Sequence, residues 1–588
     1  MKKLLLLLSV LSCFAFAQEN KPDWVKRSDA YTERVNKAEA QFTPESYGRQ
    51  GVEGLDDKIL DLNPGYLERS RKVTRETVEW LKKSLATEKD PLVKQDLQIL
   101  MKAEEDGLRG SELSEKYEVP YINVARLVFN GVHAILDEQV KPERYPAALV
   151  RLRKYAGMIK GTRPLTELAM ARTREGIGAG KKYPAKSQLE RDLTNTSFLE
   201  KGIAELFQKY NLDAKSELAK LHEQLVAYDD FLNKEILSKA NDDFKLPPEL
   251  YAYRLENFGV DVPAEKLRAI AHAAFNDIQK QMQEIAPEVA KQHGFTATDY
   301  RDVIAQLKKE QLVGDAILPH YKQRLADIEK IIQEKDLVTL PSRPARIRIS
   351  TDAEAAIQPA PHMEAPRLIG NTGEQGAFVL PLNIPTAPGS QAKKYDDFTF
   401  AAASWTLTAH EARPGHELQF DSMVEHGVSQ ARALYAFNST NVEGWGLYSE
   451  WITKPYMPPD GQLISLQHRL LRSARAFIDP ELQAGVLTPA QAKEILMKDG
   501  VFSDAMATQE VERYTFRMPG QATSYFYGYT RLLALRNEVE HLLGPSFDQH
   551  KYHDFILAQG LLPPDLLRKA VLEQFVPTLK PVMAQVKP

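Results

Sequence analysis

Apolar residues recur at three- and four-residue spacing from about Asp23 to Lys335, which is the pattern of helices with one buried face. Similar stripes cover residues 73–85 and 216–237, and no internal repeat is visible. These faces predict a helical core rather than a cofactor-binding surface. The clearest stripe follows a helix start at Asp261 and Pro263 and consists of Leu267, Ile270, Ala274, Ile278, Met282 and Ile285.

The pattern changes between Leu337 and Pro388, where proline, glycine and β-branched residues interrupt the helical stripes. Ile347 and Ile349 alternate with arginines, and residues 376–382 form a short apolar run bounded by turns. We therefore predict a small sheet here. Two uses for it stay open, an edge strand that pairs with substrate backbone and a structural hairpin.

The length and composition are those of a large globular protein. The chain has 588 residues, of which 43% are hydrophobic and 27% charged. This length suits several domains or one multi-lobed helical unit. Because the candidate chemistry lies in residues 396–588, we expect a mainly α fold in which residues 18–588 form one multi-lobed domain. The long helical first part then provides the walls and lid of a cleft.

The first 17 residues have the features of a signal peptide: two lysines, an apolar run and the small-residue sequence Ala15-x-Ala17. We expect export to the periplasm. Lipid attachment at Cys13 is the alternative, since Val10-Leu11-Ser12-Cys13 loosely resembles a lipoprotein signal. The apolar run is shorter than the roughly 20 residues that a membrane-spanning helix needs, so we expect no integral membrane span.

Charge and cysteine content narrow the chemistry further. The net charge of −4 argues against a nucleic-acid partner. Cys13 is the only cysteine and is lost on cleavage after Ala17, so any metal ion must be held by histidines and carboxylates. No sequence feature indicates an oligomeric state.

A candidate metal site begins at His410 and Glu411. A zinc hydrolase needs two imidazole ligands, a third ligand that is often a carboxylate, an open position for water and a nearby Glu that accepts its proton. His416 lies six residues after His410, and positions i and i+6 diverge by about 120° on a regular helix. Pro414 lacks an amide and Gly415 tolerates unusual backbone angles, so we predict a bulge that brings the two histidines together. Unrelated histidines on a broken helix are the alternative.

Glu443 and Glu450 lie seven residues apart and so share one helix face. One of them can be the third ligand while the other orients a histidine ligand. Solvated surface carboxylates are the alternative interpretation. Gly444 and Gly446 each cost a helix about 1 kcal/mol relative to Ala, which predicts close packing at this face.

A third cluster surrounds Tyr525. If a helix begins at Pro519-Gly520, then Gln521, Tyr525 and Gly528 share a face. A tyrosine hydroxyl there can donate to the oxyanion that forms when a peptide carbonyl is attacked, although aromatic packing explains Tyr525 equally well. Arginines that could hold a substrate carboxylate, or simply form ion pairs, are Arg472, Arg475, Arg517 and Arg531.

Three motifs together resemble a known family. They are His410-Glu-x-x-Pro-Gly-His416-x-Leu-Gln, Glu443-Gly-Trp-x-Leu-Tyr-x-Glu450 and Pro519-Gly-Gln-Ala-x-Ser-Tyr525-x-x-Gly528. In this order they resemble the bacterial DUF885 family, itself similar to thimet oligopeptidase and angiotensin-converting enzyme. The resemblance covers most of the mature chain. It implies a helical, zincin-like peptidase fold that encloses a cleft and holds one zinc ion.

The resemblance also implies residue roles. His410, His416 and Glu443 would be zinc ligands, Glu411 the general base and Tyr525 a hydroxyl that contacts the transition state. Many members carry a histidine where this chain has Gln483, which puts in doubt any role of that position in substrate binding.

The resulting expectation is an exported zinc metallopeptidase that acts on peptides. Hydrolysis of non-peptide amides or esters and a non-catalytic envelope protein remain the alternatives. The sequence predicts neither a residue preference nor a carboxypeptidase, dipeptidase or endopeptidase mode.

Overall fold

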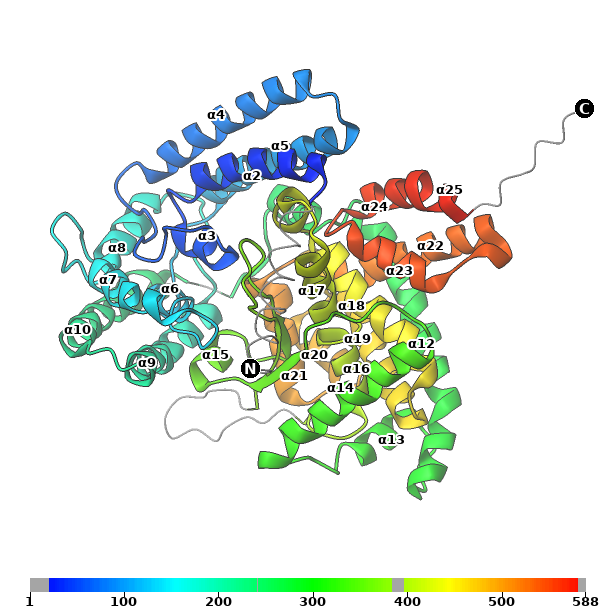
Figure 1. Cartoon of the computed structure of the whole chain (residues 1–588). Helices are drawn as coiled ribbons and strands as arrows, with labels where there is room; N and C mark the ends of the chain where they lie inside the picture. Colours follow the sequence, from blue (N-terminus) through cyan, green and yellow to red (C-terminus); the bar gives the residue numbers. More distant parts are fainter. Residues whose placement is uncertain (1–20, 241, 383–395, 580–588) are drawn as a thin grey trace, which may run out of the picture.

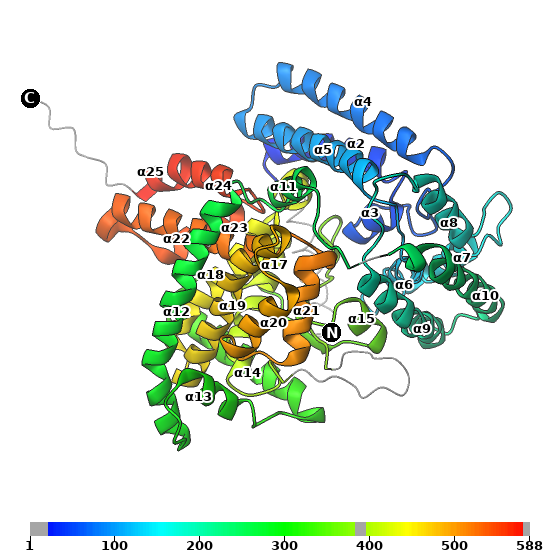
Figure 2. The same cartoon turned by 180° about the vertical axis from the view of Figure 1, so that it is seen from behind.

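The computed structural model describes residues 21–240, 242–382 and 396–579, and the chain there is mainly helical. The expected signal peptide, including Cys13, lies outside these described residues. The helices form two lobes that lie side by side (Figures 1 and 2). Within the described ranges, no helix combines the length and the apolar character that crossing a membrane requires.

The N-terminal lobe consists of α2–α10. Its upper layer is formed by α2, α4 and α5, and α6–α10 pack around a separate apolar core (Figure 1). Asp90 illustrates how these helices begin: its carboxylate accepts the amides of Leu92 and Val93, and Pro91 occupies the first helical position. The helices are α2 Asp23–Glu39, α3 Pro44–Gln50, α4 Tyr66–Thr87, α5 Pro91–Tyr117, α6 Val124–His133, α7 Pro146–Tyr155, α8 Leu165–Gly176, α9 Lys186–Lys209 and α10 Lys215–Phe231.

The C-terminal lobe holds the larger cores and all the predicted chemistry. Its helices before the sheet are α11 Pro248–Asn257, α12 Ala264–His293, α13 Tyr300–Leu307 and α14 Ile317–Glu334. Those after it are α16 Ala403–Glu411, α17 His416–His426, α18 Ser439–Thr453, α19 Pro459–Gln483, α20 Pro489–Lys498, α21 Asp504–Glu512, α22 Thr523–Leu543, α23 Gln549–Ala558, α24 Pro564–Ala570 and α25 Val576–Leu579.

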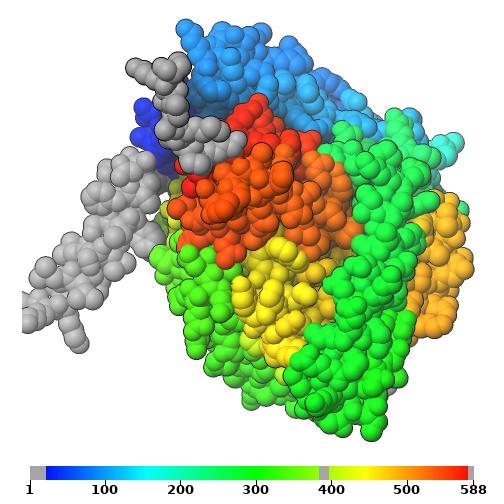
Figure 3. Space-filling model, turned by 90° about the vertical axis from the view of Figure 1, so that its right-hand side faces the viewer, coloured from blue at the N-terminus to red at the C-terminus, as the bar shows by residue number. Residues whose placement is uncertain are grey.

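Helix α12 tests the apolar stripe predicted from the sequence. Leu267, Ile278 and Met282 are buried as predicted, and the helix packs along α19. Ile270 is 44% exposed, so its assignment to the core is wrong, and Phe275 is buried instead. The reason is that the contacts with α19 and α13 bury a narrower face of α12 than the full apolar stripe covers. Figure 3 shows α12 as a long ridge on the side of this lobe.

The predicted small sheet is present, with strands β1 Arg346–Ile349, β2 His362–Glu364 and β3 Ala377–Leu380. The strand order is β1-β3-β2, β1 pairs parallel to β3, and β2 pairs antiparallel to it. Because the two predicted strands run parallel, they cannot form the structural hairpin that was one of the two interpretations. The central strand β3 is fully buried, whereas β2 is an edge strand beside α17.

The two lobes meet at a seam that contains a cavity of about 670 Å³. Tyr66 and Tyr121 of the N-terminal lobe line it together with Phe516 and Arg517 of the C-terminal lobe. The first part of the chain lines this cavity with residues of α4, α5, α8 and α9 and, beyond α10, with Phe244, Leu246 and Arg254. Helix α12 packs against α19, and α14 packs against α16, the helix that carries His410.

Candidate metal centre

The two histidines lie on different helices. His410 belongs to the last turn of α16 and His416 is the first residue of α17, with residues 412–415 between the two helices. The predicted bulge is therefore a complete break in the helix. The break brings the imidazole rings to a centroid separation of 4.6 Å at an angle of 79°.

Gly415 makes this close return possible. A Cβ atom at this position would lie 1.9 Å from the carbonyl oxygen of His410 and 2.4 Å from that of Ala409. Both contacts are far shorter than non-bonded atoms allow, so a side chain here would push α17 away from α16. The glycine in the motif is explained by this backbone contact.

Arg413 holds the connecting turn in place, a role that no pattern in the sequence indicated. Its buried guanidinium donates to Glu417 at 2.7 Å, to Glu329 of α14 at 2.7 Å and to the carbonyl oxygen of Arg343 at 2.6 Å. A buried charge needs such partners, because desolvation is otherwise too costly. The only sequence signal was a charged residue between Ala412 and the helix-breaking Pro414-Gly415 pair.

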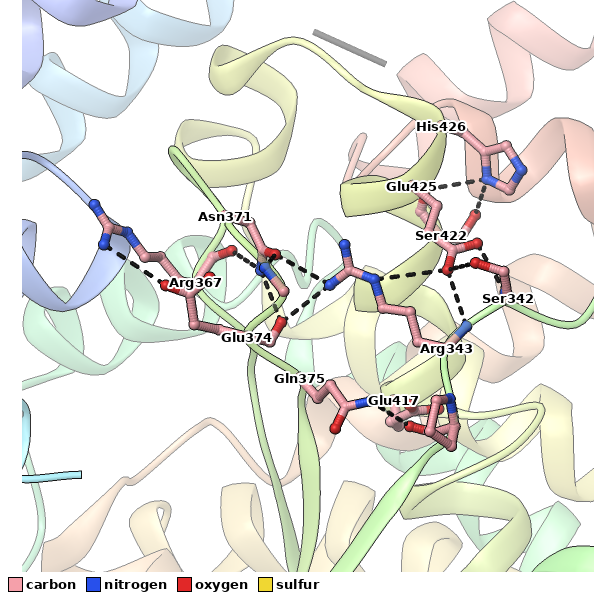
Figure 4. A network of polar contacts seen from close by, with 12 residues as sticks. Ser342, Arg343, Arg367, Asn371, Glu374, Gln375, Glu417, Ser422, Glu425 and His426 are labelled. Carbon is pink, nitrogen blue, oxygen red and sulfur yellow. Dashed lines mark hydrogen bonds and ion pairs between the residues drawn. The ribbon is translucent and has the colours of Figure 1, made fainter. Parts of the chain in front are cut away.

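The far end of α17 is anchored as well (Figure 4). Glu425 accepts the amide of Ser342 at 3.0 Å and its hydroxyl at 2.7 Å. The next residue, Arg343, donates hydrogen bonds to the side chain of Asn371 at 3.1 Å and to the carbonyl oxygen of Glu374 at 3.0 Å. The helix that carries His416 is thus tied to the segments that lead into β1 and β3.

Glu443 of α18 completes a three-residue cluster. Its Oε2 atom lies 3.4 Å from Nε2 of His410 and 3.3 Å from Nε2 of His416. One potential ligand atom of each residue lies within 4.8 Å of the others. A tetrahedral zinc ion with bonds of about 2.0–2.1 Å separates its ligand atoms by about 3.3–3.4 Å, so both imidazole–carboxylate distances match such an ion.

The hydrogen bonding and electrostatics of the cluster also fit a cation. Oε2 of Glu443 is buried and accepts no hydrogen bond from the described residues, which is costly for a carboxylate unless a cation satisfies it. Burial lowers the pKa of His410, but the carboxylates of Glu443 and Glu450 outweigh burial and raise it to about 9. The site therefore attracts positive charge and offers two nitrogens and an oxygen, a ligand set typical of zinc.

Glu450 orients the His410 ring by bonding Nδ1, the nitrogen that does not face Glu443. Its Oε1 atom lies 2.8 Å from Nδ1 of His410, and its Oε2 atom accepts the hydroxyl of Thr406 at 2.7 Å. Burial raises the pKa of this carboxyl, but Arg472 and His410 lower it to about 2, so it remains charged. Of the two glutamates that share a face, Glu443 therefore joins the cluster and Glu450 holds the imidazole.

We predict that Glu450→Gln weakens zinc binding about 10–100-fold, the usual cost of changing a residue that orients a metal ligand. The amide removes the negative charge that makes Nε2 of His410 a stronger donor. Competition with a zinc-selective chelator measures the affinity. The exposed Glu573→Gln serves as a matched control, and equal affinities of both variants would contradict the assigned role.

Glycines at the face of α18 provide the close packing that the sequence predicted. A Cβ at Gly446 would lie 2.6 Å from Cε1 of His410, so this glycine makes room for the imidazole. A Cβ at Gly444 would lie 2.7 Å from the carbonyl carbon of Gly528 on α22. The two helices therefore cross with backbone against backbone, which places α22 next to the cluster.

Tyr525 lies on α22 with its ring stacked on that of His410, at a centroid separation of 6.3 Å and an angle of 11°. The helix begins at Thr523, not at Pro519-Gly520 as predicted. Tyr525 is 7% exposed. Burial, followed by the Glu443 carboxylate, raises its pKa, so the hydroxyl stays protonated and can donate a hydrogen bond.

The remaining predicted residues have other partners. Gln521 donates to Ser439 at the start of α18, and Arg531 bonds the Tyr527 hydroxyl and Asp565. On α22, Arg531 follows Tyr525 by six residues and so faces about 120° away from it. The structure thus brings neither Gln521 nor Arg531 into the cluster.

The arginines of α19 are engaged in ion pairs. Arg475 makes two 2.7 Å bonds to Glu510, and its guanidinium lies 4.4 Å from the centre of the Tyr525 ring. Arg472 lies 3.5 Å from Glu450. Both support neighbours of the cluster.

Gln483 has a structural role in this chain. Its side chain donates to the carbonyl oxygen of Tyr514 and accepts the amide of Leu246, both at 2.9 Å. Gln483 thereby connects the end of α19 to the π-helical turn Arg513–Arg517 and to the segment that precedes α11.

Comparison with known proteins finds two similar structures and one matching family. A candidate lipoprotein of unknown function from Shewanella oneidensis has a similar structure, with a TM-score of 0.67 and 18% identity, over 94% of this chain and 100% of that one. A candidate lipoprotein from Colwellia psychrerythraea gives a TM-score of 0.73 and 18% identity, over 94% and 99% of the two chains. No curated protein matches. A family model described as bacterial protein of unknown function matches residues 44–571, and the chain therefore belongs to that family, DUF885.

Proposed function

We propose that this protein is an exported zinc-dependent peptidase. The observation that carries the proposal is the meeting of His410, His416 and Glu443 at ligand-like distances, with Glu411 next to one of them. These three residues would hold the ion, which when bound activates water and polarises a substrate carbonyl. The leader-like first 17 residues support export, as does the description of the two similar structures as candidate lipoproteins.

Glu411 is the general base of the proposed reaction. It is buried at the end of α16 and close enough to His410 to help raise the pKa of that imidazole. Its carboxylate accepts the proton of the attacking water and then delivers it to the leaving amine. Tyr525 donates a hydrogen bond to the oxygen on which negative charge develops. Glu450 keeps the His410 ring in one orientation throughout.

The choice of peptides as substrates is supported by the motif resemblance and by two features of the fold. The edge strand β2 lies beside α17, where an extended chain can add to the sheet through its backbone. The seam between the lobes holds a cavity of about 670 Å³, whose lining extends to Pro519, shortly before α22, the helix that carries Tyr525.

Metal removal tests the proposal. We expect purified protein to contain about one zinc ion per chain, to hydrolyse members of a peptide library, to lose this activity on chelation and to regain it with zinc. Small amides and esters are tested in parallel. Turnover that survives complete removal of the metal would refute zinc catalysis, and turnover of esters or small amides alone would refute the peptide assignment.

A further inference from the structure

A second cavity lies in the seam, and Arg513 in its lining lies over the ring of Tyr525. It has a volume of about 260 Å³ and is enclosed by α6 and α9 of the N-terminal lobe, residues 356–360 before β2, and α21 with the turn that follows it. We call it the arginine pocket, after the arginines in its lining, which are Arg126, Arg191, Arg513 and Arg517.

The arginine pocket favours anions although the whole chain has a net charge of −4. Its acidic residues are Asp192 and Glu510. Burial raises the pKa of Asp192, and the Tyr121 hydroxyl donates to that carboxyl at 3.0 Å. Glu510 is neutralised by the two bonds from Arg475 and receives the Tyr514 hydroxyl at 2.6 Å. Of the arginines, Arg191 pairs with Glu512 and Arg517 donates to Gln509, so the positive charge available to an anion comes from Arg126 and Arg513.

Arg513 connects the pocket to the metal centre. Its guanidinium carbon lies 5.7 Å from the centre of the Tyr525 ring, and that ring lies 6.3 Å from the ring of His410. These separations keep the guanidinium within about 12 Å of His410, a span of about three to four extended residues. Burial and the neighbouring Arg475 lower the pKa of Arg513, but Tyr525, Glu510 and Glu443 outweigh them and raise it, so the guanidinium stays charged.

The acidic neighbour Glu510 does not occupy the N–H donors of the Arg513 guanidinium. Its NH1 group lies 3.7 Å from Glu510, beyond hydrogen-bond distance, and within the described part of the chain its guanidinium forms no hydrogen bond. Arg126 on the opposite wall is exposed and makes no ion pair with a described residue. A planar guanidinium with available donors matches the geometry of a carboxylate.

We propose that the arginine pocket binds the C-terminal carboxylate of a peptide whose scissile bond lies at the His410–Glu443 cluster. The protein then removes one to three residues from the C-terminus of its substrates. This inference rests on the proposed peptidase function and specifies its substrate class. The small volume of the pocket supports a chain end, because binding pockets for whole ligands usually measure about 300–1,000 Å³ and a passing polypeptide needs more room.

A pair of substrates tests the proposal. One peptide carries a free C-terminal carboxylate, and its twin is amidated at the same residue. We expect the wild-type zinc enzyme to prefer the free acid about 100-fold in kcat/KM, as hydrogen bonds to a charged group predict. Arg513→Gln is expected to reduce this preference to near unity by raising KM for the free acid, with little change for the amide. Arg513→Lys, which keeps the charge but not the planar donors, should retain part of it.

Other variants separate this role from a structural one. The exposed Arg126→Gln cannot disturb the core and should lower the preference about 10-fold, in line with the loss of one weaker charged contact. Arg75→Gln, at an exposed arginine of α4 that pairs with Glu112 of α5, should leave the preference unchanged. Binding provides a readout without turnover: zinc-loaded Glu411→Gln protein should bind the free acid about 100-fold more tightly than the amide in calorimetry, and the addition of Arg513→Gln should abolish the difference.

Equal cleavage of acid and amide by the wild type would overturn the carboxylate pocket and leave the peptidase intact. Faster cleavage of an amidated peptide that ends in Glu would show that an acidic side chain is bound instead, and would also overturn it. If Arg513→Gln does not fold, an unchanged preference in Arg126→Gln overturns the proposal. Absence of hydrolysis for every peptide would refute the peptidase function itself.

Discussion

Glu411→Gln is expected to lower kcat/KM for peptide hydrolysis by about 10²–10⁴-fold, the contribution of a general base positioned by its protein. The amide has nearly the same shape as the carboxylate but cannot accept the proton of the attacking water. Because Glu411 is not part of the His410–His416–Glu443 cluster, the zinc content should stay at one ion per chain. Metal analysis and steady-state kinetics on the same preparation measure both quantities.

Two controls sharpen this experiment. Glu573→Gln makes the same chemical change at an exposed position on the surface and should leave kcat/KM unchanged. Substitution of the ligand His416 should remove the zinc together with the activity, which distinguishes loss of the base from loss of the metal. Retained turnover in zinc-loaded Glu411→Gln would rule out the assigned base.

Gly528→Ala is expected to destabilise the protein by about 3 kcal/mol or more, the upper range for overpacking of a well-packed contact. The new Cβ would lie 2.0 Å from the carbonyl oxygen of Thr440 and 2.9 Å from Cα of Gly444. Both neighbours are backbone atoms of α18, so they cannot move without shifting the helix. Alanine gains about 1 kcal/mol of helix propensity over glycine, which only partly offsets the clash. Denaturant unfolding measures the difference.

Gly107→Ala is the matched control for this change. Gly107 also lies within a helix, α5, but a Cβ there has no neighbour within 4 Å. The same substitution should therefore stabilise the protein by up to about 1 kcal/mol through helix propensity alone. Equal effects at both positions would show that the crossing of α18 and α22 is not constrained by its glycines. Loss of zinc affinity in Gly528→Ala would further show that this crossing positions Glu443.

Local patterns predicted the mainly helical class and the position of the sheet. Apolar spacing predicted α4, α10 and α12, and a change in composition predicted the sheet before α16. The errors concern relations between segments. Ile270 looked like a core residue because it belongs to the apolar stripe, yet the neighbouring helix covers only part of that stripe. The parallel pairing of β1 and β3 could not be read from two short apolar runs, since the direction of pairing depends on the path of the chain between them.

For the candidate site, too, some features could be predicted from the sequence and others could not. By itself the sequence determined which residues have suitable chemistry, because ligand type, the helix-breaking Pro414-Gly415 pair and the glycines of α18 are local properties. Only the tertiary structure decided that Glu443 meets both histidines while Glu450 supports one of them. It also introduced Arg413 and Arg513, which no motif had marked. The physical reason is that the distances between ligands depend on contacts between remote segments, such as that of Arg413 with Glu329 of α14 and that of Gly444 with Gly528 of α22. Neither contact leaves a signal in the spacing of residues along the chain.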